Sequence, residues 1–347
     1  MSEISLLIVD DDESIQVTFQ DSYEIANNLS YTLRIHKALT EEDANKLIDS
    51  LEIDLAIIDL KLNSTETENL GGNQVIDQII SKLRVPIIIH SATPSALSEV
   101  NAKKVIKKFN KDCDKIEILN EIEKLHNTGI FSILGRRGKI EELINKIYWD
   151  SFSTNLNEWQ NCEHQLLRHF AAHLHKELEY IDAREDNFLP NEFYVSSVSQ
   201  DHNMTGNIYQ KDEVYYVTIT PACDFAQNSV RKPIEGVTLL KIDTDKIAQL
   251  ATEIKSETST NKKQSLESKL KNLITNNSAK YYFFPKNLLF KEGVVNFQKI
   301  TTITYSDLEN YKNVLSVSPV FTKDLISKFS AYFARQGSPD ISATALA

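Results

Sequence analysis

The sequence predicts a chain of at least two domains that begins with a doubly wound α/β fold. Short apolar runs at 6–9, 55–58 and 86–89 each end at polar residues, as strands buried on both faces of a parallel sheet do. Between them, start signals such as Thr40 followed by Asp43 indicate helices. We therefore predict strands that alternate with helices up to about residue 125, with a ligand site beyond the carboxyl ends of the strands.

Composition narrows the class of protein before any motif is considered. The formal net charge of -11 argues against the phosphate backbone of nucleic acid as the main partner. Three widely separated cysteines give no disulfide framework and suit a reducing compartment. No apolar run approaches the roughly 20 residues that cross a bilayer, and the N-terminus lacks the basic region of a signal peptide. We expect a cytoplasmic protein with no membrane partner.

The pattern changes twice after the first domain, which we place at 1–126. Residues 127–187 have helical periodicity and are predicted to form a helical connector. Residues 188–347 alternate strand and helix signals, which predicts an α+β domain with a small barrel-like or curled sheet. Within it, residues 246–278 are rich in Lys, Glu, Ser, Thr and Asn and are expected to form a polar insertion or a hairpin of helices.

Polar residues follow four of the predicted strands, and all of them should meet at one edge of the sheet. In strand order they are Asp10 to Asp12, Asp59, Ser91, and Lys107 or Lys108. Carboxylates confined in one site repel one another, and a hard divalent ion such as Mg²⁺ relieves the repulsion by taking oxygen ligands. A carboxylate beside such an ion can attack a phosphoryl group, while a hydroxyl and an ammonium bind its oxygens. The set predicts phosphoryl transfer to an aspartate.

The segments LLIVDDDES, DLAIIDLKLN, VPIIIHSAT and VIKKF resemble, in this order, the four signature segments of the receiver domain of two-component response regulators. The resemblance covers about one third of the chain and implies a flavodoxin-like five-stranded parallel sheet. It implies that Asp59 is the phosphoacceptor, with Ser91 as the hydroxyl and Lys108 as the lysine of the site. It also implies a Mg²⁺ cofactor held by Asp10, Asp11, Asp59 and the carbonyl of Lys61.

The resemblance further implies a histidine kinase or a phosphotransfer protein as the phosphoryl donor. The chain departs from the family pattern near the fourth helix, which should be short. Val105 stands where most receivers carry the aromatic switch residue, and Phe109 replaces the usual proline after the lysine. We therefore expect the phosphorylation signal to leave by an unusual route. The C-terminal domain would then act on a protein partner of unknown identity, and a homodimer is left open.

Two groups of residues beyond the receiver segments have the chemistry of a site. In the helix CEHQLLRHFAAHLHKELE, His169, His173 and Glu177 are four residues apart and share a face, a spacing that can hold a transition metal. The companion residues of a metallohydrolase are missing, so a polar helix face is the competing interpretation. In YYVTITPACDFAQ, Cys223 and Asp224 follow a strand.

A nucleophilic Cys223 would need a base, and His202 is the only histidine in the β-rich region. The competing interpretation is a buried cysteine beside a turn-forming aspartate. This segment, together with TGNIY and FARQGSPD, resembles an uncharacterised domain found with bacterial receivers, which implies no activity.

Three functions follow from these observations. The first is a signalling protein in which phosphorylation of Asp59 changes how the C-terminal domain meets its partner. The second is a phosphate sink, a receiver that drains a kinase without an output of its own, as occurs in bacterial signalling and in some phage-defence operons. The third is an enzyme regulated by the receiver, with Cys223 or a His169/His173 metal site. No helix-turn-helix with a basic recognition helix supports a transcription factor.

Overall fold

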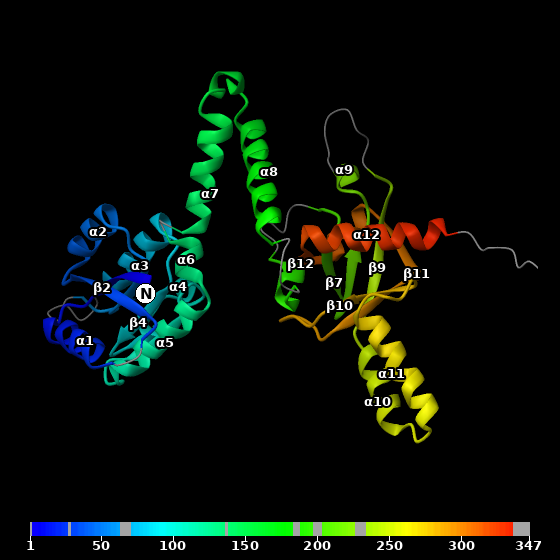
Figure 1. Cartoon of the computed structure of the whole chain (residues 1–347), viewed down its shortest axis with the longest axis horizontal. Helices are drawn as coiled ribbons and strands as arrows, with labels where there is room; N and C mark the ends of the chain where they lie inside the picture. The colour runs from blue at the N-terminus through cyan, green and yellow to red at the C-terminus, as the bar shows by residue number, and fades with distance from the viewer. Residues whose placement is uncertain are drawn as a thin grey trace, which may run out of the picture. The chain divides into compact units, whose positions relative to one another are not determined.

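The computed structural model describes residues 2–26, 29–62, 71–135, 138–182, 188–196, 203–225 and 234–335. The chain divides into two compact units, Met1–Arg184 and Glu185–Ala347. Most of the segment that we predicted as a connector is grouped with the first unit. Figure 1 shows the elements of each unit.

The first unit contains a five-stranded parallel sheet in the order β2-β1-β3-β4-β5. Its strands are β1 (Ser2–Val9), β2 (Tyr31–Ala38), β3 (Leu55–Ile58), β4 (Ile87–Ser91) and β5 (Lys107–Asn110). This is the doubly wound order of flavodoxin-like folds, which place their ligands beyond the carboxyl ends of the strands. The predicted α/β fold is therefore confirmed.

Helices cover both faces of this sheet, which explains why the central strands are apolar throughout. The helices are α1 (Glu13–Ile25), α2 (Glu41–Ser50), α3 (Gly71–Lys82), α4 (Glu99–Ala102) and α5 (Lys115–Asn127). Leu7 and Val9 of β1 belong to the core cluster that includes α2 and α3, whereas Leu6 and Ile8 belong to the cluster that includes α1 and α5. The predicted cap of α2 is confirmed, since Thr40 Oγ1 accepts from the Asp43 amide at 3.1 Å. The fourth helix is short, as predicted, with only four residues.

A helical hairpin ends the first unit. It comprises α6 (Ile130–Leu134), α7 (Lys139–Ile147), a π-helical turn (Tyr148–Phe152), a 3-10 turn (Leu156–Trp159) and α8 (Glu163–Asp182). Helices α7 and α8 lie side by side and run in opposite directions (Figure 1). An ion pair joins them at 2.8 Å between Lys146 Nζ and Glu177 Oε2. Phe152 is buried under the tip of the hairpin, where the rings of Trp159 and Phe170 contact it.

The second unit contains an antiparallel sheet of seven strands in the order β10-β11-β9-β8-β7-β12-β6. The strands are β6 (Tyr194–Val195), β7 (Asn207–Lys211), β8 (Val214–Thr218), β9 (Gly236–Asp243), β10 (Tyr281–Phe284), β11 (Gly293–Thr304) and β12 (Lys312–Val317). The two ends of this order approach each other, because the Tyr194 hydroxyl donates to the Pro285 carbonyl at 2.6 Å. The rings of Phe193 and Phe284 are 5.3 Å apart. The sheet is therefore curled, and the predicted α+β class is confirmed.

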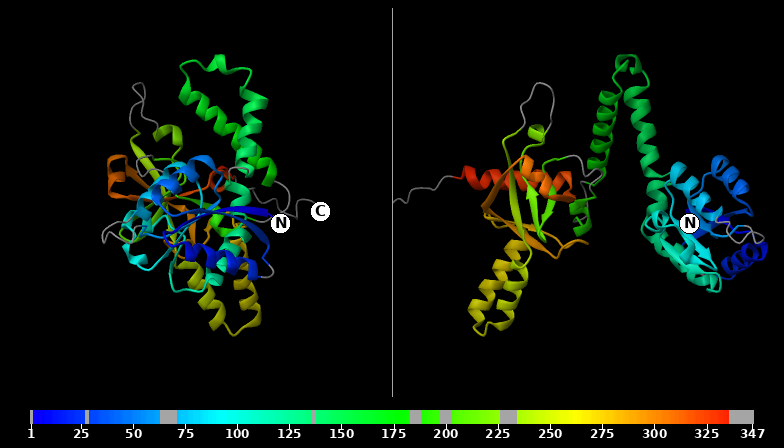
Figure 2. Two further views of the ribbon diagram at one scale, coloured as in Figure 1. Left: turned by 90° about the vertical axis from the view of Figure 1, so that its left-hand side faces the viewer. Right: turned by 180° about the vertical axis from the view of Figure 1, so that it is seen from behind.

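Helices complete the second unit. Helix α12 (Pro319–Ala334) lies across the curled sheet and buries Leu325 in its core (Figure 1). A short α9 (Ala222–Phe225) follows β8. The segment predicted as a polar insertion forms a hairpin of α10 (Lys246–Ser256) and α11 (Thr260–Ile274), visible in both views of Figure 2. No described helix of the chain is long and apolar enough to cross a membrane.

Candidate functional site at the carboxyl ends of the parallel strands

The strand register brings two predicted aspartates to one edge of the parallel sheet. Val9 of β1 pairs with Ile58 of β3, so Asp10 and Asp59 both lie one residue beyond that pair. The Asp59 amide donates to the Val9 carbonyl at 2.8 Å, which continues the ladder past the end of the strands. Both residues are buried, with 1% exposure for Asp10 as a whole and 3% for Asp59. Carboxylates this buried need a positive partner.

The loop after β1 separates the three consecutive aspartates into different roles. Asp12 caps helix α1, because its carboxylate accepts from the Ser14 amide at 2.8 Å. Asp10 Oδ1 accepts from the Asp12 amide at 3.0 Å. The buried Gln16 amide donates to the carbonyl oxygens of Asp10 and Ala38 at 2.9 and 3.1 Å, which fixes the loop. Asp10 and the half-buried Asp11 are thus the two that remain for the site.

The ammonium group at this site belongs to Lys111, and the expectation that Lys108 supplies it is wrong on geometry. Lys111 Nζ lies 2.5 Å from Asp59 Oδ2 and 3.0 Å from Asp10 Oδ1. Lys108 lies inside β5, where it pairs in register with Ile89 of β4, and its side chain is exposed. We expected the fifth strand to end before Lys107 or Lys108, but both lysines lie inside β5, which ends at Asn110. The lysine that follows the strand is therefore Lys111.

The carboxylates of Asp10, Asp11 and Asp59 fit a divalent cation. Among the described residues, these three have ligand atoms within 4.8 Å of one another. Asp10 Oδ2 is buried without a hydrogen-bond partner, and burial raises the pKa of that carboxyl above its ordinary value. A hard cation takes oxygen ligands of this kind and would remove both penalties. The Lys61 amide donates to Asp59 Oδ1 at 3.2 Å, whereas the part predicted for the Lys61 carbonyl stays a prediction.

The same two carboxylates also change the pKa of the Lys111 ammonium. Burial alone lowers the pKa of the Lys111 ammonium, but the hydrogen bonds and charges of Asp59 and Asp10 outweigh burial and raise it. The lysine is therefore held charged at neutral pH. Ser91, which ends β4, is buried with 1% exposure, and its hydroxyl accepts from the Thr93 amide at 3.3 Å. Its predicted role as the hydroxyl of the site stays a prediction.

Two further buried residues support the loop that carries Lys111, and sequence reasoning missed both. Lys115 Nζ lies 2.9 Å from His90 Nε2 and donates to the Lys111 carbonyl at 3.1 Å. Burial, and after it the Lys115 ammonium, lowers the pKa of His90 to about 4. His90 is therefore neutral at pH 7, so its Nε2 can accept from Lys115. The one feature of the sequence that could have indicated this contact is a histidine that follows directly on the apolar run of a buried strand.

With Lys111 in place of Lys108 as the lysine of the site, the neighbouring positions of the receiver pattern also move by three residues. The place of the aromatic switch moves from Val105 to Lys108, and the place of the usual proline moves from Phe109 to Asp112. Neither position carries the usual residue after the shift, so the departure from the family pattern remains.

The candidates outside the receiver segments have different surroundings. Cys223 is exposed on α9, with its Sγ 3.4 Å from Asp224 Oδ1. His202 lies outside the described residues, so the pairing of Cys223 with His202 stays a prediction. The structure does bring His169 and His173 together on α8, with their Nε2 atoms 3.3 Å apart. Glu177 instead pairs with Lys146 of α7.

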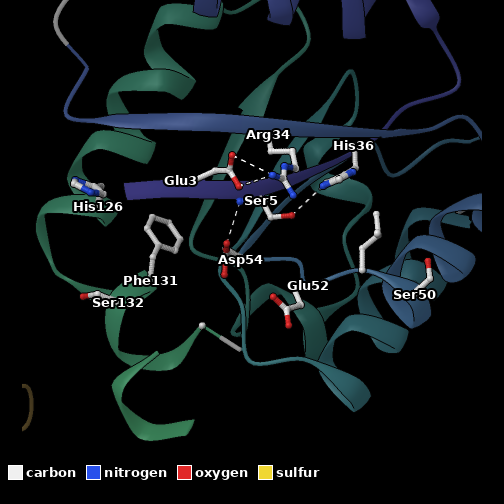
Figure 3. Close-up of a pocket in the computed structure, with 12 residues that line it drawn as sticks. Glu3, Ser5, Arg34, His36, Ser50, Glu52, Asp54, His126, Phe131 and Ser132 are labelled. Carbon is white, nitrogen blue, oxygen red and sulfur yellow. Dashed lines mark hydrogen bonds and ion pairs between the residues drawn. The ribbon is translucent and has the colours of Figure 1, made fainter. Parts of the chain in front are cut away.

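A cavity of about 580 Å³ lies elsewhere on the first unit, beside β1, β2 and α6 (Figure 3). Several of its polar side chains form ion pairs or hydrogen bonds with other residues that line the cavity. Arg34 pairs with Glu3 at 3.0 Å, and His36 Nε2 lies 3.0 Å from the Ser5 hydroxyl. Asp54 accepts from the Ser5 amide at 3.0 Å. This cavity is separate from the carboxylate site.

Comparisons with known proteins found structural similarity to the first third of the chain. No protein-family profile and no curated protein sequence matches the chain. The signal receiver domain of a LuxO repressor protein from Vibrio parahaemolyticus is similar at 21% identity over 36% of this chain and 96% of that one, with a TM-score of 0.30. The response regulator TrrA from Thermotoga maritima, in complex with Mg²⁺ and BeF, is similar at 22% identity over 35% and 98%, with a TM-score of 0.29. The first third of this chain is thus similar in structure to response-regulator receiver domains.

Proposed function

We propose that the chain is a phosphoacceptor of the response-regulator type and that Asp59 receives the phosphoryl group. One observation carries the proposal. The buried Asp59 carboxylate lies at the sheet edge between a lysine ammonium and Asp10, which has a carboxylate oxygen without a partner. A buried carboxylate in such surroundings can react with an electrophile that brings its own negative oxygens.

The residues of the site divide the work of the transfer. A carboxylate oxygen of Asp59 forms a bond to phosphorus while the bond from phosphorus to the donor's leaving atom breaks. Lys111, held by both aspartates, is close enough to turn its ammonium to the phosphoryl oxygens, where charge is spread in the transition state. Ser91 would donate its hydroxyl to another of these oxygens.

The acidic residues would hold Mg²⁺, which when bound neutralises charge on the phosphoryl oxygens. Asp10, Asp11 and Asp59 would supply the side-chain ligands, and the Lys61 carbonyl would add a backbone one. The donor would be a histidine kinase or a phosphotransfer protein. The second unit would act on a protein partner when the phosphorylation state of Asp59 changes.

Phosphorylation by a small donor tests the proposal directly. The full chain is incubated with acetyl phosphate and Mg²⁺, and its intact mass is measured. We expect the mass of one added phosphoryl group, which is absent with a chelator and absent in Asp59→Asn. Asp49→Asn is a matched control, because Asp49 is an exposed aspartate of α2 in the same unit. A wild-type chain that gains no phosphoryl group, or an Asp59→Asn chain that still gains one, contradicts the proposal.

A phosphate sink is the second candidate, and the short α4 beside an exposed β5 favours it. In this case Asp59 would be phosphorylated without a change in the second unit. Hydrogen exchange of the full chain with and without phosphorylation separates the two functions. Changed protection in residues 188–347 supports the signalling function, and unchanged protection there supports the sink. The phage-defence setting and the receiver-regulated enzyme stay predictions.

A further inference from the structure

We propose that His169 and His173 form a binding site for a divalent transition-metal ion, with Zn²⁺ as the reference ion. The site lies on helix α8 of the hairpin and uses the Nε2 atoms of both imidazoles. It differs in chemistry from the acidic site, since imidazole nitrogen suits Zn²⁺, Cu²⁺ and Ni²⁺, whereas clustered carboxylates suit Mg²⁺.

The separation of the two nitrogen atoms matches what such an ion requires. The His169 and His173 Nε2 atoms are 3.3 Å apart. Zinc binds histidine nitrogen at about 2.0–2.1 Å in tetrahedral geometry, which places two ligand atoms about 3.3 Å from each other. Both imidazoles therefore already have the rotamers in which one ion can bridge them. The two nitrogens come together because the residues are four apart on one helix face.

Aromatic neighbours hold the two rings in this arrangement. The Trp159 ring stacks on His169, with centroids 5.1 Å apart and planes at 27°. Phe152 contacts both histidines edge to face, at 5.5 Å for His169 and 5.4 Å for His173. Phe152 is 2% exposed, so it is a fixed wall. Packing that locks ligand rotamers lowers the cost of binding an ion.

The outer side of the pair is open to solvent. His169 is exposed and His173 is half-buried, so an ion can reach Nε2 of both and keep positions for water or a third ligand. Glu177 lies one turn after His173 and pairs with Lys146 at 2.8 Å. It could become a ligand only by leaving that ion pair. The site therefore has two histidine ligands, and its other positions are exchangeable.

The two sites can be measured separately in one protein. Calorimetric titration of the full chain with Zn²⁺ is carried out in excess Mg²⁺, which occupies the acidic carboxylates. We expect one Zn²⁺ bound, with affinity reduced at least tenfold in His169→Ala and in His173→Ala. His164→Ala is the matched control, because His164 is exposed on the same helix, and its affinity should equal that of wild type. His169→Asn repeats the test with a side chain that keeps polar character and more of the packing volume.

A second measurement reports the position of the bound ion. The chain has two tryptophans, so Trp149→Phe leaves Trp159 as the only one. Cu²⁺ bound at His169, against which Trp159 stacks, should quench the fluorescence of Trp159, and His173→Ala should shift this quenching to at least tenfold higher Cu²⁺. The proposal is overturned if wild type binds no Zn²⁺, or if folded histidine variants bind Zn²⁺ and respond to Cu²⁺ as wild type does. If the circular dichroism spectrum shows that an alanine variant is misfolded, the result for His169→Asn decides the test instead.

Discussion

Replacing Lys111 by methionine, with Lys108→Met as control, tests the corrected site most directly. Methionine keeps the length of the side chain and removes its charge, so the main change at position 111 is the loss of an ammonium group beside two buried carboxylates. The Asp10 and Asp59 side chains are only 2% and 3% exposed, and that of Lys111 is 24% exposed. Lys108 is exposed on an edge strand. The two variants therefore make the same chemical change in opposite environments.

The burial of the three groups sets the expected magnitude. Removing one partner of a fully buried ion pair costs about 3–5 kcal/mol of stability. Water reaches part of Lys111 and can therefore reach the carboxylates that it leaves, so we expect a loss of about 2 kcal/mol for Lys111→Met in a chelator. An exposed substitution away from such features changes stability by about 0.5 kcal/mol or less, which is our expectation for Lys108→Met.

Lys111→Met, the less stable variant without Mg²⁺, should bind Mg²⁺ more tightly than Lys108→Met. The Lys111 ammonium repels a cation held by the same carboxylates, and two unit charges about 4 Å apart interact by about 4 kcal/mol at the effective dielectric constant of such sites. Part of this repulsion is enough to make Mg²⁺ bind at least tenfold more tightly to Lys111→Met, or about 1.4 kcal/mol. Mg²⁺ at 100 times its Kd then restores about 2.7 kcal/mol of stability.

Urea unfolding followed by circular dichroism, with and without Mg²⁺, measures the stability, and calorimetry measures Mg²⁺ affinity. The reasoning is refuted if Lys108→Met loses as much stability as Lys111→Met. It is equally refuted if Lys111→Met binds Mg²⁺ no more tightly than wild type does.

Three further predictions concern residues that support the site, which are His90 of β4, Gly72 of α3 and Lys115 of α5. Because the folded pKa of His90 is about 4 and its ordinary value is 6.5, the unfolded chain binds more protons, and stability should fall as pH drops from 6.5 to 4. The unfolding free energy of His90→Gln should vary less than that of wild type in this window, and equal slopes would contradict the assignment. A Cβ on Gly72 would lie 2.1 Å from the Asp59 carbonyl oxygen, so Gly72→Ala should cost about 1–3 kcal/mol and slow phosphorylation of Asp59. Gly129→Ala, distant from the site, should keep the wild-type phosphorylation rate. Lys115→Met removes the groups that hold the Lys111 carbonyl and should also slow the reaction, whereas the exposed Lys124→Met should leave the rate unchanged.

The parts of the fold that follow from the sequence are those in which the hydrophobic pattern is strong. The central strands β1, β3 and β4 carry buried apolar runs. The runs of β1 and β3 end where these strands end, and so they reveal Asp10 and Asp59. The edge strands carry a weaker pattern. Strand β2 buries only Tyr31 and Ala38 at its two ends, and β5 buries only Phe109. The apolar pair Val105 and Ile106 lies before β5 and led to the early placement of the lysine.

Hydrophobic patterns and motif spacing do not predict contacts between residues that are far apart in the sequence. The hydrogen bond between His90 and Lys115 joins residues 25 positions apart, and neither residue type is specific for a buried partner. The four-residue spacing of His169 and His173 predicted a shared helix face. It could not predict the separation of their nitrogens, because that depends on Phe152 and Trp159, which come from the turns before the helix. In the second unit, curling of the sheet depends on contacts between β6 and β10, which are far apart in sequence.

The assignment of Lys111 also indicates which helix of the first unit is connected to the site by hydrogen bonds. The Lys111 side chain holds Asp59, and the Lys111 carbonyl accepts from Lys115, the first residue of α5. Lys115 is in turn fixed by His90, the residue before Ser91 on β4. A phosphoryl group on Asp59 would replace one Lys111 contact by another and so act on the start of α5 through a chain of direct hydrogen bonds. The α4 side has only a four-residue helix and an exposed Lys108, so the contacts around the site connect it more closely to α5 than to α4.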